Sequence, residues 1–152
     1  MNAETGIAQA APIDAETLLG LSRDAVGAAR AFQATATTDL ATRVKSGERV
    51  SGALLEAEQY AAHALAWLAT YVEALDQMSG WAERLSETGS FGETERLILQ
   101  IGMGEYLWQL YGGLPASQTE IIRPQDLGLS QDDQRAMMIP AVMTLTQEGN
   151  TQ

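Results

Sequence analysis

The sequence contains no cysteine, and it lacks any long run of apolar residues. Without cysteine the chain has no disulfide, no thiolate metal site and no cysteine nucleophile, which fits a reducing cytoplasm. No apolar stretch reaches the roughly 18 residues that a membrane-spanning helix needs, so no membrane partner is expected. We therefore expect a cytoplasmic protein without thiol chemistry.

Basic residues are also scarce. Nine lysines and arginines stand against 20 aspartates and glutamates, which gives a formal net charge of -11. A surface of this sign repels a phosphate backbone, so nucleic acid is not expected as a partner. The 152 residues, 45% of them hydrophobic, suffice for one globular domain with a sizeable core.

Three long stretches carry apolar or small residues at steps of three and four, which is typical of one face of a helix. They run from about residue 14 to 47, from 51 to 85 and from 93 to 111, with Asp14 and Ser51 as N-caps and glycines at the ends. Strand-like alternation is missing. The expected core positions are Leu18, Leu21, Ala25, Ala29, Phe32, Ala36, Leu40 and Val44, then Leu54, Ala57 or Ala61, Leu65, Leu68, Val72, Leu75, Met78 or Ala82 and Leu85, then Leu97, Ile98, Ile101, Leu107 and Leu110.

The fold predicted from these stretches is all-α, an antiparallel helical bundle of three long helices plus a kinked C-terminal helix. The N-terminal residues lack the basic cluster and apolar stretch of a secretory signal. We expect a flexible tail over residues 1–13, the bundle over 14–113, a connector over 114–129, and a C-terminal helix and tail over 130–152.

The C-terminal helix has a start signal and an interruption. Ser130 with Asp133 resembles a capping box in which aspartate replaces the usual glutamate. Pro140 would cost about 3 kcal/mol inside a straight helix, so a kink or two short helices are expected. Its apolar side chains are expected to be exposed and to need a partner surface: Met137, Met138, Ile139, Val142, Met143 and Leu145.

His63 is the sole histidine, so any catalytic dyad or metal site would have to use it. No G-x-S-x-G turn accompanies it, and Tyr60 stands where a di-iron bundle needs glutamate. We therefore predict no metal site and assign no catalytic residue. A packed or surface role on a helix is favoured for His63.

Tyr60, His63, Trp67 and Tyr71 recur at steps of three, four and four, which places their rings along one side of a helix. Such a stripe either stacks on a flat ligand or packs against a neighbouring helix, and packing is the commoner case. Together with Met137, Met138 and Met143, these residues form the predicted interaction surface.

Gly102 and Gly104 resemble a phosphate loop only weakly, because the preceding strand and the lysine are missing. Two glycines this close together inside a helix are better explained by a close approach of a second helix.

The segments HALAWLATYVEAL, from His63 onwards, and FGETERLILQIGMGEYLWQLYGGLPASQTEIIRPQDLGL resemble the N-terminal helical extension of the (2S)-methylsuccinyl-CoA dehydrogenase family. These are flavoproteins of the acyl-CoA dehydrogenase superfamily. The resemblance implies an accessory domain that precedes a dehydrogenase body, which binds FAD and supplies a glutamate base. None of the family's catalytic or flavin-binding residues has a matching position in this sequence.

Two functions remain open from the sequence. The first is a non-catalytic accessory domain with an assembly or interaction role, whose partner is a dehydrogenase body or a second copy of itself. Such a chain binds no cofactor, and FAD belongs to the full-length enzyme. The alternative is a stand-alone helical binding protein that encloses a small apolar ligand. An autonomous enzyme is disfavoured because no nucleophile–base pair is present.

Overall fold

The computed structural model describes residues 13–148, so residues 1–12 of the tail predicted over 1–13 lie outside this range, as do the last four residues, 149–152. The described chain is 77% helical, which confirms the all-α prediction. The elements are α1 (Ala15–Val44), β1 (Lys45–Ser46), β2 (Arg49–Val50), α2 (Gly52–Ala57), α3 (Gln59–Glu87), α4 (Glu93–Gly112), β3 (Leu114–Pro115), β4 (Ile121–Ile122), the 3-10 helix η1 (Pro124–Leu127), α5 (Gln131–Met137) and α6 (Pro140–Glu148). Within this range no helix has the length and apolarity to cross a bilayer.

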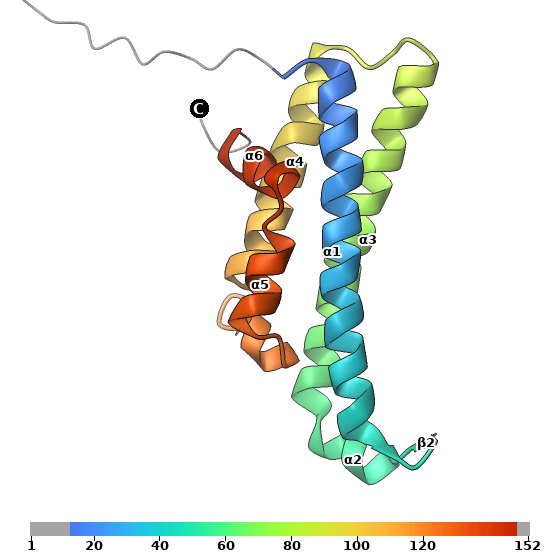
Figure 1. The fold of residues 1–152 in the computed structure, drawn as a ribbon, viewed down its shortest axis with the longest axis vertical. Coiled ribbons are helices and arrows are strands. Elements are labelled where there is room, and N and C mark those ends of the chain that lie inside the picture. The colour runs from blue at the N-terminus through green and yellow to red at the C-terminus, as the bar shows by residue number, and fades with distance from the viewer. Residues whose placement is uncertain (1–12, 149–152) are drawn as a thin grey trace, which may run out of the picture.

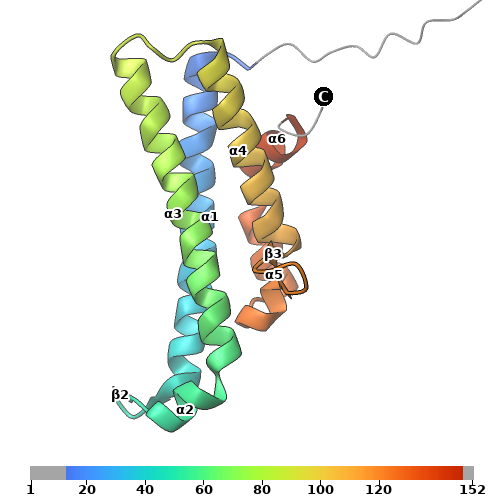
Figure 2. The same cartoon turned by 180° about the vertical axis from the view of Figure 1, so that it is seen from behind.

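The helices form an up-and-down bundle. Figure 1 shows α1, α3 and α4 running antiparallel in turn, and α5 with α6 takes the fourth position. The helix α6 packs against α4 and α1, whereas α5 packs against α1. The view from behind shows α3 and α4 in front of α1 (Figure 2). Because α4 is shorter than α1 and α3, these two helices project beyond it and carry α2 and the β1–β2 hairpin at their tip.

Three predicted N-caps are confirmed. The Asp14 carboxylate accepts a hydrogen bond from the Thr17 amide at 2.9 Å, and Ser51 Oγ accepts one from the Leu54 amide at 3.4 Å. Ser130 and Asp133 form a reciprocal box, in which the Asp133 amide donates to Ser130 Oγ at 3.1 Å and the Ser130 amide donates to the Asp133 carboxylate at 2.8 Å. These bonds satisfy amides that the first helical turn leaves unpaired.

The predicted single helix over residues 51–85 is wrong at its start. The chain breaks at Glu58 into α2 and α3, and the Glu58 carboxylate pairs with Arg43 near the end of α1. No residue of α2 is buried, and Leu54 is 38% exposed instead of lying in the core. An ion pair to a residue 15 positions earlier leaves no periodic signal in the sequence, so the pairing of Glu58 with Arg43 could not be predicted from spacing.

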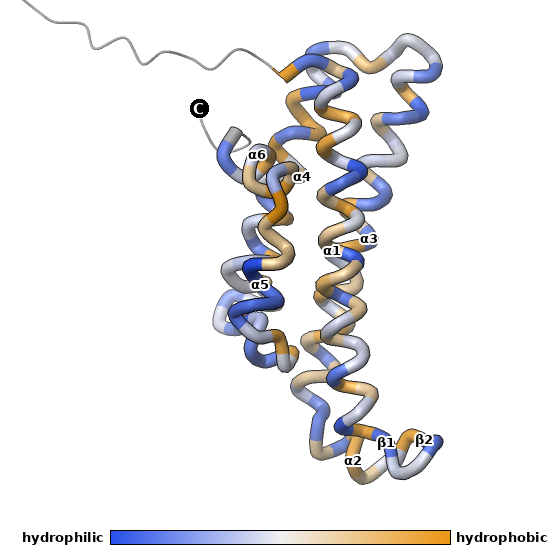
Figure 3. The backbone as a smooth tube through the Cα atoms, in the orientation of Figure 1, coloured by the Kyte–Doolittle hydropathy of each residue, from blue (hydrophilic) through white to orange (hydrophobic). Residues whose placement is uncertain are grey.

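The core follows the predicted faces of α1 and α3. Leu18, Ala25, Phe32, Leu68 and Leu75 are all buried in one cluster that extends to α4 and α6. Figure 3 shows hydrophobic and hydrophilic residues alternating along each long helix, as this one-sided packing requires. At Gly102 an added Cβ would lie 2.7 Å from the Met78 sulfur, so a side chain of α3 occupies the space beside this glycine.

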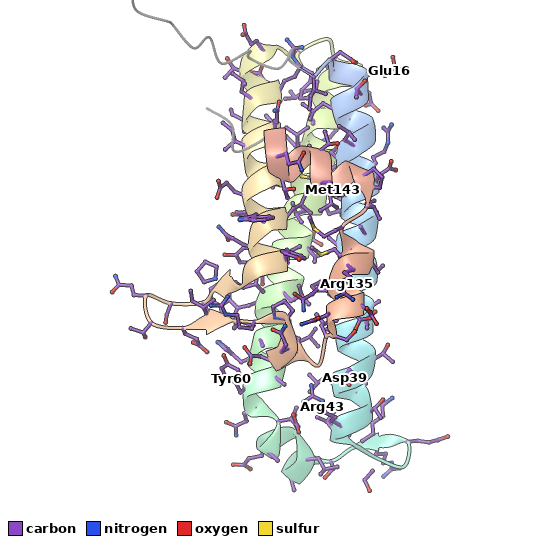
Figure 4. The ribbon with its side chains drawn as sticks, turned by 60° about the vertical axis from the view of Figure 1, so that its left-hand side comes forward. Glu16, Asp39, Arg43, Tyr60, Arg135 and Met143 are labelled. Atoms are coloured by element: carbon purple, nitrogen blue, oxygen red, sulfur yellow. The ribbon has the colours of Figure 1, made fainter. Side chains whose placement is uncertain are left out.

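Pro140 separates two short helices, as predicted. It is the first residue of α6, a position where a missing amide breaks no helical hydrogen bond. The expected exposure of this region is wrong, however. Met137, Val142 and Leu145 are 2%, 0% and 0% exposed, and Met138 and Ile139 are half-buried against the same core. Met143 is the exposed member of the predicted set, and Figure 4 labels it on α6.

The capping box makes a pH-dependent contribution to stability. Hydrogen bonds from the Ser130 side chain and backbone lower the pKa of Asp133 below its usual 3.8. A carboxyl group whose pKa is lowered by folding stabilises the folded state at pH values above its pKa in the unfolded chain. This stabilisation is lost as the pH falls through the pKa of the folded state. We expect Asp133→Ala to lower the melting temperature near pH 7, and the difference from the unsubstituted chain to shrink below pH 3.8. Thermal unfolding followed by circular dichroism measures both, and a difference that stays constant with pH would contradict the ionic origin of the effect.

Candidate interaction surfaces

The ring-bearing stripe on α3 makes contacts within the chain. The Tyr71 ring lies 4.9 Å from the Tyr106 ring of α4, measured between centroids, and both side chains are half-buried. Trp67 is also half-buried, and its indole N–H donates to His63 Nε2 at 3.1 Å. The stripe is more exposed near the N-terminal end of α3, where Tyr60 is 48% exposed and the His63 side chain is 52% exposed.

The connector brings carboxylates to the open end of this stripe. Partial desolvation, together with the charges of Asp126 and Glu120, raises the pKa of Tyr60 above its usual 10.0. The Glu120 carboxylate lies 4.0 Å from His63 Nε2, the same nitrogen that accepts the hydrogen bond from the Trp67 indole. Across residues 13–148, no group of three histidines or carboxylates is placed to hold a metal ion.

Met137 lines a groove that the aromatic stripe does not reach. A groove of about 340 Å³ lies between α1 and α5, and its lining includes Met137 but none of the four α3 rings. The lining residues are Ala28, Ala31, Phe32, Thr35, Asp133, Ala136, Met137 and Ile139. Met137 is buried against the core, so it does not belong to an exposed interaction surface.

The outer face of α4 is an apolar surface whose residues were predicted to lie in the core. Leu97, Ile98 and Ile101 were expected in the core, but they are 49%, 52% and 40% exposed. The opposite side of the helix is the buried one, and its core residues are Leu99, Met103, Leu107 and Leu110. Because apolar residues occupy both sides of α4, periodicity alone could not decide which side faces inward.

Trp108 extends this outer face towards the C-terminal end of α4. It is 52% exposed, and its ring stacks on Tyr111 with centroids 5.7 Å apart and planes 23° from parallel. We call Leu97, Ile98, Ile101 and Trp108 the α4 outer face.

A second apolar patch lies at the projecting tip of α1 and α3. Val50, Leu54 and Leu55 are 57%, 38% and 40% exposed there. Their exposure resembles that of the α4 outer face, but they come from a hairpin and a six-residue helix.

Comparison with known proteins gives one informative match. No family model matches the chain. It is 52% identical over 134 residues to a (2S)-methylsuccinyl-CoA dehydrogenase of Cereibacter sphaeroides, and the match covers 88% of this chain. The match covers 24% of that relative, so the chain spans about a quarter of the relative's length. The expected resemblance to this dehydrogenase is confirmed: the chain is homologous to a segment of a (2S)-methylsuccinyl-CoA dehydrogenase.

Proposed function

We propose that the chain is an accessory helical module of an FAD-dependent acyl-CoA dehydrogenase that acts on methylsuccinyl-CoA. It corresponds to the N-terminal extension of such an enzyme, and its role is to support the assembly of the dehydrogenase body. The observation that carries the proposal is the 52% identity along a segment that makes up about a quarter of the relative.

The surface of the module supports a role within a larger protein. The outer face of a surface helix is ordinarily polar, yet α4 presents three aliphatic side chains and a tryptophan there. Exposed apolar patches of this kind mark places where another surface packs. A dehydrogenase body next to the module would supply that surface.

The flavin in this proposal belongs to the body. The groove between α1 and α5 does not fit FAD, because its lining consists mainly of small or apolar side chains and one carboxylate, Asp133. A carboxylate repels the pyrophosphate of a dinucleotide, which protein sites ordinarily hold with helix N-termini or basic side chains. When bound to the body, the flavin supplies the hydride acceptor for the oxidation.

The proposal is tested in the intact C. sphaeroides enzyme. One variant lacks the homologous segment, and a chimera carries the present chain in its place. We expect the deletion to lower bound FAD and to change the molar mass of the assembled enzyme, and we expect the chimera to restore both. Flavin absorbance per protein and light scattering after gel filtration give the two readouts. A deletion variant with the same flavin content and molar mass as the intact enzyme would contradict an assembly role.

A further inference from the structure

Three of the four residues of the α4 outer face lie along one side of the helix. At 100° per residue, Leu97, Ile101 and Trp108 lie within about 40° of one another, and they span about 16 Å along the helix. The stacking contact with Tyr111 restricts the Trp108 ring, which makes it a preformed anchor. Tryptophan is among the residues that contribute most to protein interfaces. The core of this chain does not need these four side chains, because α4 buries its other side.

The charges around this face argue against a second copy as the occupant. Glu93, Glu95 and Glu105 lie on the same helix, which carries one basic residue, Arg96. The whole chain has a net charge of -11, so two copies would bring like charges together. A complementary partner has an apolar patch with basic residues at its rim.

We infer that the α4 outer face docks onto the dehydrogenase body and that Trp108 is the central anchor of this contact. The inference rests on the proposed function and adds to it the face that is covered. About three quarters of the relative lies outside the matched segment, so in the relative a large body in the same polypeptide is available to cover this face. In this arrangement the patch formed by Val50, Leu54 and Leu55 remains exposed to solvent.

The absence of cysteine allows a direct test with a single thiol. Ile101→Cys places a unique thiol on the α4 outer face, and Leu55→Cys places one on α2, at the projecting tip of α1 and α3, where exposure is the same at 40%. Each variant is prepared as the free chain and within the C. sphaeroides chimera. The rate of maleimide modification of that one residue is then measured by peptide mass spectrometry.

We expect the thiol of Ile101→Cys to react with maleimide at least about tenfold more slowly in the chimera than in the free chain, because it reacts only while the face is undocked. A tenfold ratio corresponds to a modest population of the undocked state. The thiol of Leu55→Cys is expected to react at a similar rate in both. Equal rates for Ile101→Cys in both contexts, with flavin and assembly intact, would overturn the inference and leave the proposed function standing. Protection of Leu55→Cys alone would assign the contact to the projecting tip of α1 and α3.

Two further outcomes separate the inference from the proposal on which it rests. A dimeric free chain in which Ile101→Cys is already protected would assign the face to a second copy. A chimera that neither binds flavin nor assembles would contradict the proposed function and remove this inference with it.

Discussion

Leu145→Ala is expected to lower the free energy of unfolding by about 2–5 kcal/mol. Leu145 is fully buried on α6, in the same cluster as residues of α1, α3 and α4. Removing the end of this side chain leaves a cavity among closely packed helices. These helices cannot move far enough to fill it, so the lost contacts are not replaced. Urea unfolding followed by circular dichroism measures the change.

Met143 provides the matched control on the same helix. It is 44% exposed, so Met143→Ala is expected to change the free energy of unfolding by about 0.5 kcal/mol or less. Small and equal effects of both substitutions would show that α6 lies outside the cooperative core, and the interpretation of the C-terminal helix as a partner-binding tail would return.

Gly128→Ala is expected to destabilise the fold by about 2–4 kcal/mol, because two separate penalties add. Gly128 ends η1 with φ at +75°, a left-handed conformation that alanine adopts only with strain. A Cβ at this position would also lie 2.1 Å from the Asp39 carboxylate on α1. Asp39 is held in turn by Arg43, whose Nε lies 2.9 Å from Asp39 Oδ2, and Figure 4 labels both on the lower part of α1.

Gly27→Ala is the control for this substitution. Gly27 lies exposed within α1, and no atom would lie within 4 Å of its added Cβ. Alanine there is expected to stabilise the helix by about 0.5–1 kcal/mol. The same chemical change should therefore have opposite signs at the two glycines, as measured by chemical unfolding. A neutral Gly128→Ala would show that the connector does not pack against α1 as described.

Much of this fold could be predicted from the sequence because the signals are local. Asp14 and Ser130 precede their helices with side chains that can cap only the residues directly after them. The apolar residues of α1 lie on one face of the helix, so its buried side could be predicted from their spacing. Pro140 indicated the break between α5 and α6 for the same reason, since proline acts on its own turn of the helix.

The failures of prediction have a common physical origin in contacts between distant residues. Glu58, where the predicted helix breaks, pairs with the distant Arg43, and the inward side of α4 depends on where α3 and α6 pack. The predicted exposure of the C-terminal region was wrong because burial there depends on how α5 and α6 pack against α1 and α4, which no local pattern indicates. After the break at Met138, the buried residues Met137 and Val142 no longer need to share one helical stripe.

The rate of methylsuccinyl-CoA oxidation per bound FAD, measured in the C. sphaeroides chimera, tests the central claim most directly. If the chain is an accessory module that takes the place of the homologous segment, the chimera should oxidise methylsuccinyl-CoA within about threefold of the intact relative, a difference below 1 kcal/mol in activation free energy. A chimera no more active than the deletion variant, or a deletion variant as active as the intact enzyme, would contradict the claim.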